Sequence, residues 1–151
     1  MYKKILFGTC LTEYCSNIFN YALNLAQEND AKLWIYYGLG RLNLDEAGAE
    51  QAIKKAEADV AQAYVQQMKD RDFNNYAINV SDGDVVSELS KLARNASIDL
   101  MVMGTSTEVP LAMGGSSDVR PLGATIADAL LWAPCPVMII PPSLIPGLAR
   151  G

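Results

Sequence analysis

Short apolar runs alternate along the chain with longer segments of helical periodicity. The apolar runs cover residues 3–9, 32–40, 98–105 and 135–140, and residues 75–80 alternate between apolar and polar positions. Between these runs, apolar residues recur every three or four positions over residues 13–28, 45–70, 85–96 and 124–132. The pattern predicts buried strands, one half-exposed strand and amphipathic helices in the order βαβαβαβαβ.

Strands that alternate with helices predict an α/β fold, here a single doubly wound five-stranded parallel sheet, Rossmann-like, with helices on both faces. The expected strand order is 3-2-1-4-5, because the runs at 3–9 and 98–105 are apolar on both faces and belong at the centre. A ligand is expected outside the carboxyl ends of the strands, at the switch point. The length suits one domain, which we assign to residues 1–142, with residues 143–151 as a loosely held tail.

Charge and composition exclude several classes of function. With 12 basic and 17 acidic residues the net charge is −5, and the absence of a Lys/Arg cluster argues against nucleic acid as a partner. The chain has no histidine, so it has neither a Ser–His nor a Cys–His nucleophile pair. No apolar run reaches membrane-spanning length and no leader precedes the first strand, so we expect a soluble, cytoplasmic protein.

Three cysteines, Cys10, Cys15 and Cys135, make an odd count without a disulfide-rich spacing, which is typical of reduced thiols. Cys10 and Cys15 lie at a strand end and near a helix start, so they are expected to come close, and a redox pair is one interpretation. The spacing favours the other, in which small buried cysteines pack the core and thiol chemistry is incidental. Three thiolates without an imidazole do not make a metal site.

The stretch "MGTSTEVPLAMGGSSDVRPLG", residues 103–123, has the glycine-, serine- and threonine-rich composition from which phosphate-binding loops are built. Its only basic residue is Arg120, and the charges of residues 105–122 sum to −1. The subsegment Gly114-Gly115-Ser116-Ser117 is a candidate anion-binding nest. The favoured interpretation is an ordinary flexible surface loop.

Three stretches resemble the universal stress protein family: "ILFGTCLTEYC", "DGDVVSELSKLARNASIDLMVMGT" and "GATIADALLWAPCPVMII". The likeness extends over nearly the whole chain, up to Pro141 and Pro142. The resemblance implies a five-stranded parallel sheet, frequent homodimers, and membership of one of two branches, of which one binds ATP and the other does not.

In members that bind ATP, the resemblance implies contacts from the first strand, the second strand and the loop after the fourth. We place these contacts on this chain and add the candidate nest as a displaced phosphate loop. The candidate adenine-nucleotide positions are then Thr9, Cys10, Gly38, Met103, Gly104, Gly115, Ser116, Arg120, Gly123, Ala124 and Thr125. The chain departs from the family pattern in several places. Cys10 replaces an aspartate, Thr107 a glycine and Ala124 a hydroxyl residue, and the loop is longer.

These departures predict a non-catalytic regulatory or binding module of the stress response, with weak or absent ATP binding. The alternative is an adenine-nucleotide-binding protein or slow ATPase that uses a rebuilt phosphate loop around residues 114–117 and Arg120. The last apolar run, "CPVMIIPP", predicts an edge strand through which a homodimer forms, with Val137 and Ile139 in the contact.

Overall fold

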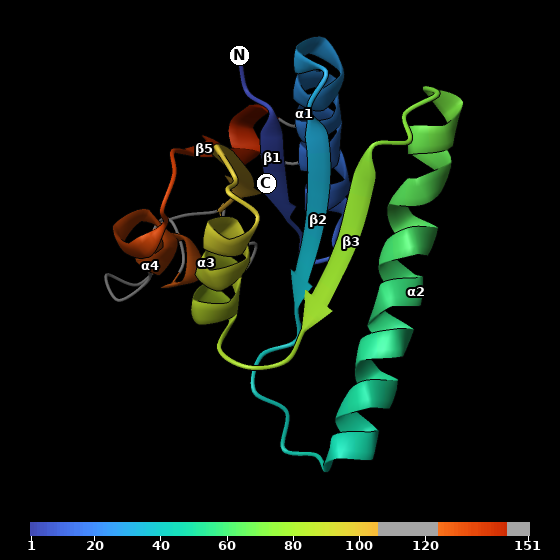
Figure 1. Ribbon diagram of the computed structural model, residues 1–151, viewed down its shortest axis with the longest axis vertical. Coiled ribbons are helices and arrows are strands. Elements are labelled where there is room, and N and C mark those ends of the chain that lie inside the picture. Colours follow the sequence, from blue (N-terminus) through green and yellow to red (C-terminus); the bar gives the residue numbers. More distant parts are fainter. Residues whose placement is uncertain (106–123, 145–151) are drawn as a thin grey trace.

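Five parallel strands form one sheet in the order β3-β2-β1-β4-β5, as the sequence predicts (Figure 1). The structure is a computed structural model that describes residues 1–105 and 124–144. The strands are β1 (Lys4–Gly8), β2 (Lys32–Gly38), β3 (Tyr76–Ser81), β4 (Leu100–Gly104) and β5 (Val137–Ile140). β1 lies at the centre, hydrogen-bonded to β2 on one side and to β4 on the other.

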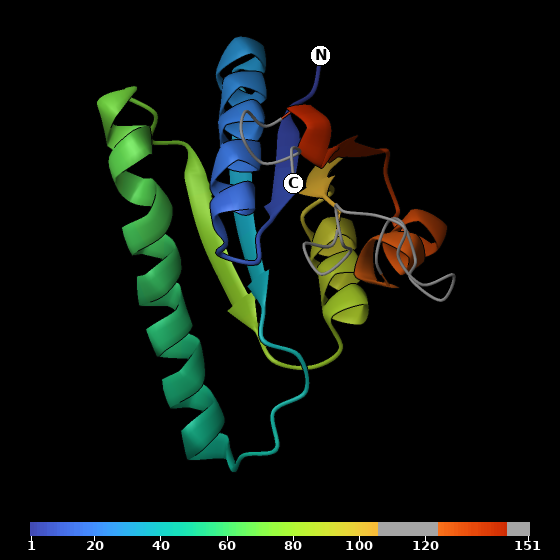
Figure 2. The same ribbon diagram turned by 180° about the vertical axis from the view of Figure 1, so that it is seen from behind.

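Helices cover both faces of this sheet (Figures 1 and 2). Helices α1 and α2 lie on one face, and α3 and α4 lie on the other. Their bounds are α1 (Glu13–Asn29), α2 (Glu46–Asp70), α3 (Val85–Asn95) and α4 (Ala124–Trp132). The fold is therefore the doubly wound α/β arrangement that the alternation of strands and helices predicts.

The side chains of β1 alternate between two separate cores because successive residues of a strand point to opposite faces. Ile5 and Phe7 enter the core beneath α1 and α2, and Leu6 enters the core beneath α3 and α4. All three side chains are fully buried. The larger core includes an aromatic cluster in which the ring centroids of Phe19 and Tyr64 are 4.4 Å apart.

Three helices begin at residues that suit the N-cap position. The side chains of Thr12, Asp45 and Asp84 accept hydrogen bonds from backbone N–H groups in the first turns of α1, α2 and α3. Such bonds satisfy donors that the helix itself leaves unpaired. Asp84 stands directly before the periodic segment 85–96, where the sequence pattern places an N-cap.

Four strands, β1, β2, β4 and β5, are shorter than their apolar runs, and two of these ends have a clear local cause. β2 ends at Gly38, because Gly40 adopts a left-handed φ of 77° and turns the chain toward Gly83, whose N–H bonds the Gly40 carbonyl. β5 begins at Val137, since Pro136 has no N–H and only its carbonyl bonds to the neighbouring strand. Pro142–Leu144 form a 3₁₀ turn that includes the first two residues of the expected loose tail, and residues 145–151 lie outside the described part.

Candidate functional site

The carboxyl ends of β1, β2 and β4 meet at one edge of the sheet, where sequence reasoning places a ligand. The backbone N–H of Thr9 donates to the carbonyl of Tyr36, which ties the end of β1 to β2 at 2.9 Å. Gly104 ends β4 on the other side of β1. Five predicted positions thus lie in three adjacent strands or just after one of them: Thr9, Cys10, Gly38, Met103 and Gly104.

Thr9 is buried at this edge, and its hydroxyl is engaged inside the protein. Its Oγ1 lies 2.5 Å from the hydroxyl oxygen of Tyr64 on α2, and it also accepts the N–H of Leu11 at 3.0 Å. Burial raises the pKa of Tyr64 to about 12, so this phenol stays protonated at neutral pH. The Thr9 side chain therefore links β1 to α2.

Cys10 follows Thr9 and is exposed, which corrects the expectation that it is a buried packing residue. Its Sγ lies 2.8 Å from the Sγ of Cys15 and 3.3 Å from the hydroxyl of Thr12. The hydrogen bond from Cys15, more than that from Thr12, lowers the pKa of Cys10 to about 6 despite partial burial. Cys15 is buried as expected, and its hydrogen bond to Cys10 and its burial raise its pKa.

Gly104 leaves room for side chains of α1. A Cβ placed on Gly104 overlaps the Cδ1 atom of Ile18 and lies 2.8 Å from the ring Cζ and hydroxyl oxygen of Tyr14. That hydroxyl donates to the carbonyl of Ile140 at 2.5 Å and accepts the N–H of Thr105 at 3.0 Å. The absence of a side chain at Gly104 thus permits α1 to pack closely against the end of β4.

Gly38 and Met103 are also surrounded by other side chains of the fold. A Cβ on Gly38 lies 2.9 Å from the hydroxyl oxygen of Tyr36 and 3.0 Å from a methyl carbon of Val85. Met103 is buried in the core beneath α3 and α4. Sequence reasoning identified these strand ends but missed Tyr14, Tyr36 and Tyr64, whose partners are distant in the sequence.

The remaining predicted positions lie after β4, in the segment that ends with the first turn of α4. Gly115, Ser116, Arg120 and Gly123 lie outside the described residues, as does the interpretation of this segment as a flexible surface loop. Ala124 and Thr125 form the backbone of the first turn of α4. The predicted phosphate contacts therefore stay predictions.

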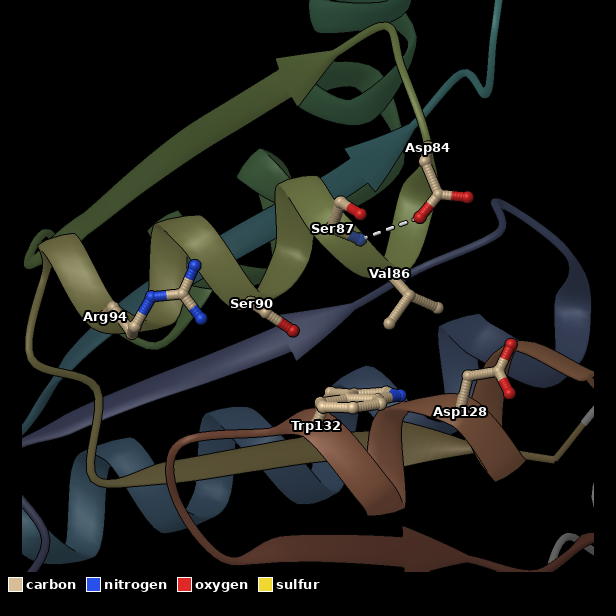
Figure 3. Close-up of a pocket in the computed structure, with 7 residues that line it drawn as sticks. All are labelled: Asp84, Val86, Ser87, Ser90, Arg94, Asp128 and Trp132. Carbon is tan, nitrogen blue, oxygen red and sulfur yellow. Dashed lines mark hydrogen bonds between the residues drawn. The ribbon is translucent and has the colours of Figure 1, made fainter.

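A hollow that sequence reasoning did not identify lies between α3 and α4 (Figure 3). Its volume is about 400 Å³. Asp84 stands at one end, where its carboxylate accepts the N–H of Ser87 at 3.0 Å; this bond holds its pKa below the usual range. Arg94 and the ring of Trp132 lie toward the other end, and Trp132 is 69% exposed. The lining residues are Asp84, Val86, Ser87, Ser90, Arg94, Asp128 and Trp132.

Two further observations concern residues 1–105 and 124–144. This part of the chain holds no group of three or more His, Cys, Asp or Glu side chains placed to bind a metal ion. Nor does it contain a helix with the length and apolar character needed to cross a membrane.

Solved structures share this fold over most of their length. A universal stress protein in complex with cAMP matches with a TM-score of 0.71 and 21% identity, over 92% of this chain and 97% of that chain. A universal stress protein family member from Burkholderia pseudomallei matches with a TM-score of 0.67 and 23% identity, over 93% and 96%. A family protein from Arabidopsis thaliana with AMP bound matches with a TM-score of 0.61 and 17% identity, over 92% of this chain and 91% of that chain.

The sequence itself gives the more decisive comparison. The curated proteins include no significant match to this chain. Residues 1–141, however, match the universal stress protein family. This match spans the whole sheet, from β1 through β5, and agrees with the strand order and helical layers described above. The chain belongs to the universal stress protein family.

Proposed function

We propose that this chain is a non-catalytic binding or regulatory module of the stress response that binds ATP weakly, with a Kd above roughly 100 μM, or not at all. The observation that carries the proposal is Cys10, an exposed thiol where the family resemblance implies an aspartate. Whether ionised or not, the single sulfur of Cys10 is a weaker acceptor for two ribose hydroxyls than the two oxygens of a carboxylate. Loss of one charge-assisted hydrogen bond removes about 1.5–3 kcal/mol, or one to two decades of affinity.

The neighbouring contacts support the same proposal. The hydroxyl of Thr9 is paired with Tyr64, and the space beside Gly104 is filled by Tyr14 and Ile18. A nucleotide that used these positions would have to displace contacts that join the sheet to α1 and α2. Such displacement opposes binding, because buried polar groups that lose their partners raise the free energy of the complex.

The chain's chemistry supports a module without turnover. The sequence has no histidine and no GxxxxGK[ST] phosphate loop. The most perturbed titratable groups at the carboxyl edge are thiols and a phenol. The carboxylate of Asp84, which follows β3, caps α3, and its bond to the N–H of Ser87 lowers its pKa, which makes it a weaker base. A hydrolase needs a group that activates water or holds metal-bound phosphate.

A second candidate function is adenine-nucleotide binding, including slow ATP hydrolysis, through a rebuilt phosphate loop. The AMP and cAMP bound to two similar structures favour it. In this chain Gly115 and Ser116 would supply backbone N–H groups to the phosphates, and Arg120 the counter-charge.

Titration calorimetry on ligand-stripped protein separates the two candidates. ATP with Mg²⁺, AMP and cAMP are titrated in turn, and the first proposal expects no saturable heat below roughly 100 μM. Low-micromolar binding that Arg120→Ala abolishes would overturn it and support the rebuilt loop. Lys55→Ala, which removes an exposed positive charge on α2, is the matched control and should leave any binding unchanged.

We also propose a homodimer formed through β5. β5 is an edge strand of the sheet, and one of its sides is free of any partner strand within the described part of the chain. A second copy can pair with these N–H and C=O groups. Val137→Lys or Ile139→Lys is expected to convert the dimer to monomer in light scattering, whereas Ile78→Lys on the opposite edge strand leaves it dimeric. A monomeric unmodified protein at micromolar concentration contradicts this proposal.

The three free cysteines support a reducing compartment, and we propose the cytoplasm as the place of action. Fractionation of cells with an antibody to the protein tests this location.

A further inference from the structure

Cys10 and Cys15 form a closely spaced thiol pair at the end of β1. Their Sγ atoms are 2.8 Å apart, whereas a disulfide requires about 2.05 Å, so closure needs a movement of less than about 1 Å. Cys10 lies in the β1–α1 turn and is exposed, and Cys15 lies in the first turn of α1 and is buried. We propose that this pair is a site of reversible oxidation by hydroperoxides, in which Cys10 attacks the oxidant and Cys15 closes an intramolecular disulfide.

The two thiols differ in a way that assigns their roles. Cys10 is open to an incoming oxidant, and two hydrogen bonds to its sulfur, from Cys15 and from Thr12, favour its thiolate. These contacts lower its pKa from 9.0 to about 6, so most of Cys10 is ionised at neutral pH. Cys15 keeps its proton, because its hydrogen bond to Cys10 and its burial raise its pKa. An exposed thiolate beside a protonated partner is the arrangement of an attacking and a resolving cysteine.

The chemistry balances with a hydroperoxide, ROOH, as oxidant. The Cys10 thiolate attacks the terminal oxygen, an S–O bond forms and the O–O bond breaks, and the alkoxide takes a proton from water to leave as ROH. Cys15 then attacks the sulfur of the Cys10 sulfenic acid; an S–S bond forms, the S–O bond breaks, and hydroxide leaves as water with the Cys15 proton. The thiols together lose two electrons, which the hydroperoxide gains. A dithiol reductant restores both thiols by exchange.

Oxidation would change the turn that borders the sheet edge. Leu11, between Cys10 and the cap residue Thr12, already has a φ of 60°, and its N–H bonds the hydroxyl of Thr9. A disulfide across this turn fixes its conformation and removes the thiolate from the sheet edge. Tyr64 of α2 interacts electrostatically with both thiols, and its pKa of about 12, raised mainly by burial, keeps it neutral below pH 10. The inference does not rest on the proposed function, because it needs no nucleotide.

Peptide mass spectrometry tests the proposal on the full chain. Reduced protein is treated with stoichiometric hydrogen peroxide, free thiols are alkylated with N-ethylmaleimide, and the protein is digested with trypsin. Both cysteines fall in the peptide 5–32, and Cys135 falls in another. We expect peptide 5–32 to lose its two thiol hydrogens and carry no maleimide, and dithiothreitol to restore both alkylation sites. Full alkylation of Cys10 and Cys15 after peroxide treatment overturns the proposal.

Variants separate the attacking from the resolving thiol. In Cys15→Ser the Cys10 sulfenic acid cannot be resolved, so dimedone labelling of Cys10 rises well above that of the unmodified protein. Equal labelling in the two proteins contradicts the role of Cys15. Cys135→Ser is the matched control and retains the disulfide.

The pH dependence of Cys10 alkylation gives a readout that a merely structural cysteine does not share. The rate is half-maximal near pH 6, and Cys15→Ala, which removes the main hydrogen bond to Cys10, moves this midpoint toward 9. At neutral pH Cys10 reacts at least roughly fivefold faster than Cys135, whose pKa burial raises, after allowance for the lower nucleophilicity of a more acidic thiol. A midpoint unchanged by Cys15→Ala overturns the proposed contact.

Discussion

Gly104→Ala tests whether this glycine serves the packing of the fold. The family resemblance assigns Gly104 to nucleotide binding, whereas the structure surrounds it with Ile18 and Tyr14. If its role is ligand approach, an added methyl group lowers nucleotide affinity and leaves stability unchanged. If its role is packing, the methyl group destabilises the protein with no ligand present.

The expected loss of stability follows from the contacts. The new Cβ overlaps Ile18, which is fully buried, and lies 2.8 Å from the ring and hydroxyl of Tyr14. Overpacking of a core position costs about 1–3 kcal/mol. Displacement of Tyr14 also weakens its hydrogen bonds to Ile140 and Thr105, each worth about 0.5–1.5 kcal/mol. The free energy of unfolding should fall by about 2–4 kcal/mol.

Urea unfolding monitored by circular dichroism measures this change, and a thermal scan should show the melting temperature lowered by roughly 5–15 °C. Gly8→Ala is the matched control on the neighbouring strand. Its Cβ meets Met103 at 3.5 Å and 3.7 Å, which is ordinary contact, so its stability should be unchanged or higher by about 0.4–1 kcal/mol. A Gly104→Ala protein as stable as the Gly8→Ala protein refutes the packing argument.

Three further predictions concern the same edge of the sheet. Tyr64→Phe removes the buried bond to Thr9 and should lower the free energy of unfolding by about 1–1.5 kcal/mol in urea titrations; Tyr64→Leu, which also removes the ring, should cost more. Because the folded-state pKa of Tyr64 is raised from 10.0 to about 12, the unmodified protein should lose stability as pH rises from 10 to 12. Tyr64→Phe should reduce that loss. If the two proteins give identical alkaline unfolding curves, ionisation of Tyr64 is not the cause of the loss. Cys10→Asp should tighten ATP binding about 10- to 100-fold in calorimetry, whereas the uncharged Cys10→Asn should have little effect; equal affinities remove the missing carboxylate as the cause of weak binding.

The sequence by itself determined the order of strands and helices and the centre of the sheet. Helices and strands differ in the spacing of their apolar residues along the chain, so the sequence alone indicates which of the two a segment forms. Ile5, Leu6 and Phe7 are consecutive and apolar, which indicates a strand buried on both faces, and this strand is β1 at the centre. The cap at Asp84 is equally local, because its carboxylate bonds an N–H three residues away.

Tertiary structure alone decided which side chains meet at the carboxyl edge. The pairs Thr9 with Tyr64 and Tyr14 with Thr105 join residues 55 and 91 positions apart, and no periodicity indicates such contacts. The cysteine spacing favoured a packing pair over a redox pair, and the structure corrected this for Cys10, which is exposed. The left-handed turn at Leu11 and the start of α1 decided between exposure and burial, and so set which thiol is ionised. The pKa values of the thiols and the phenol at this edge depend on burial and on hydrogen-bond geometry, and both arise only when distant segments pack together.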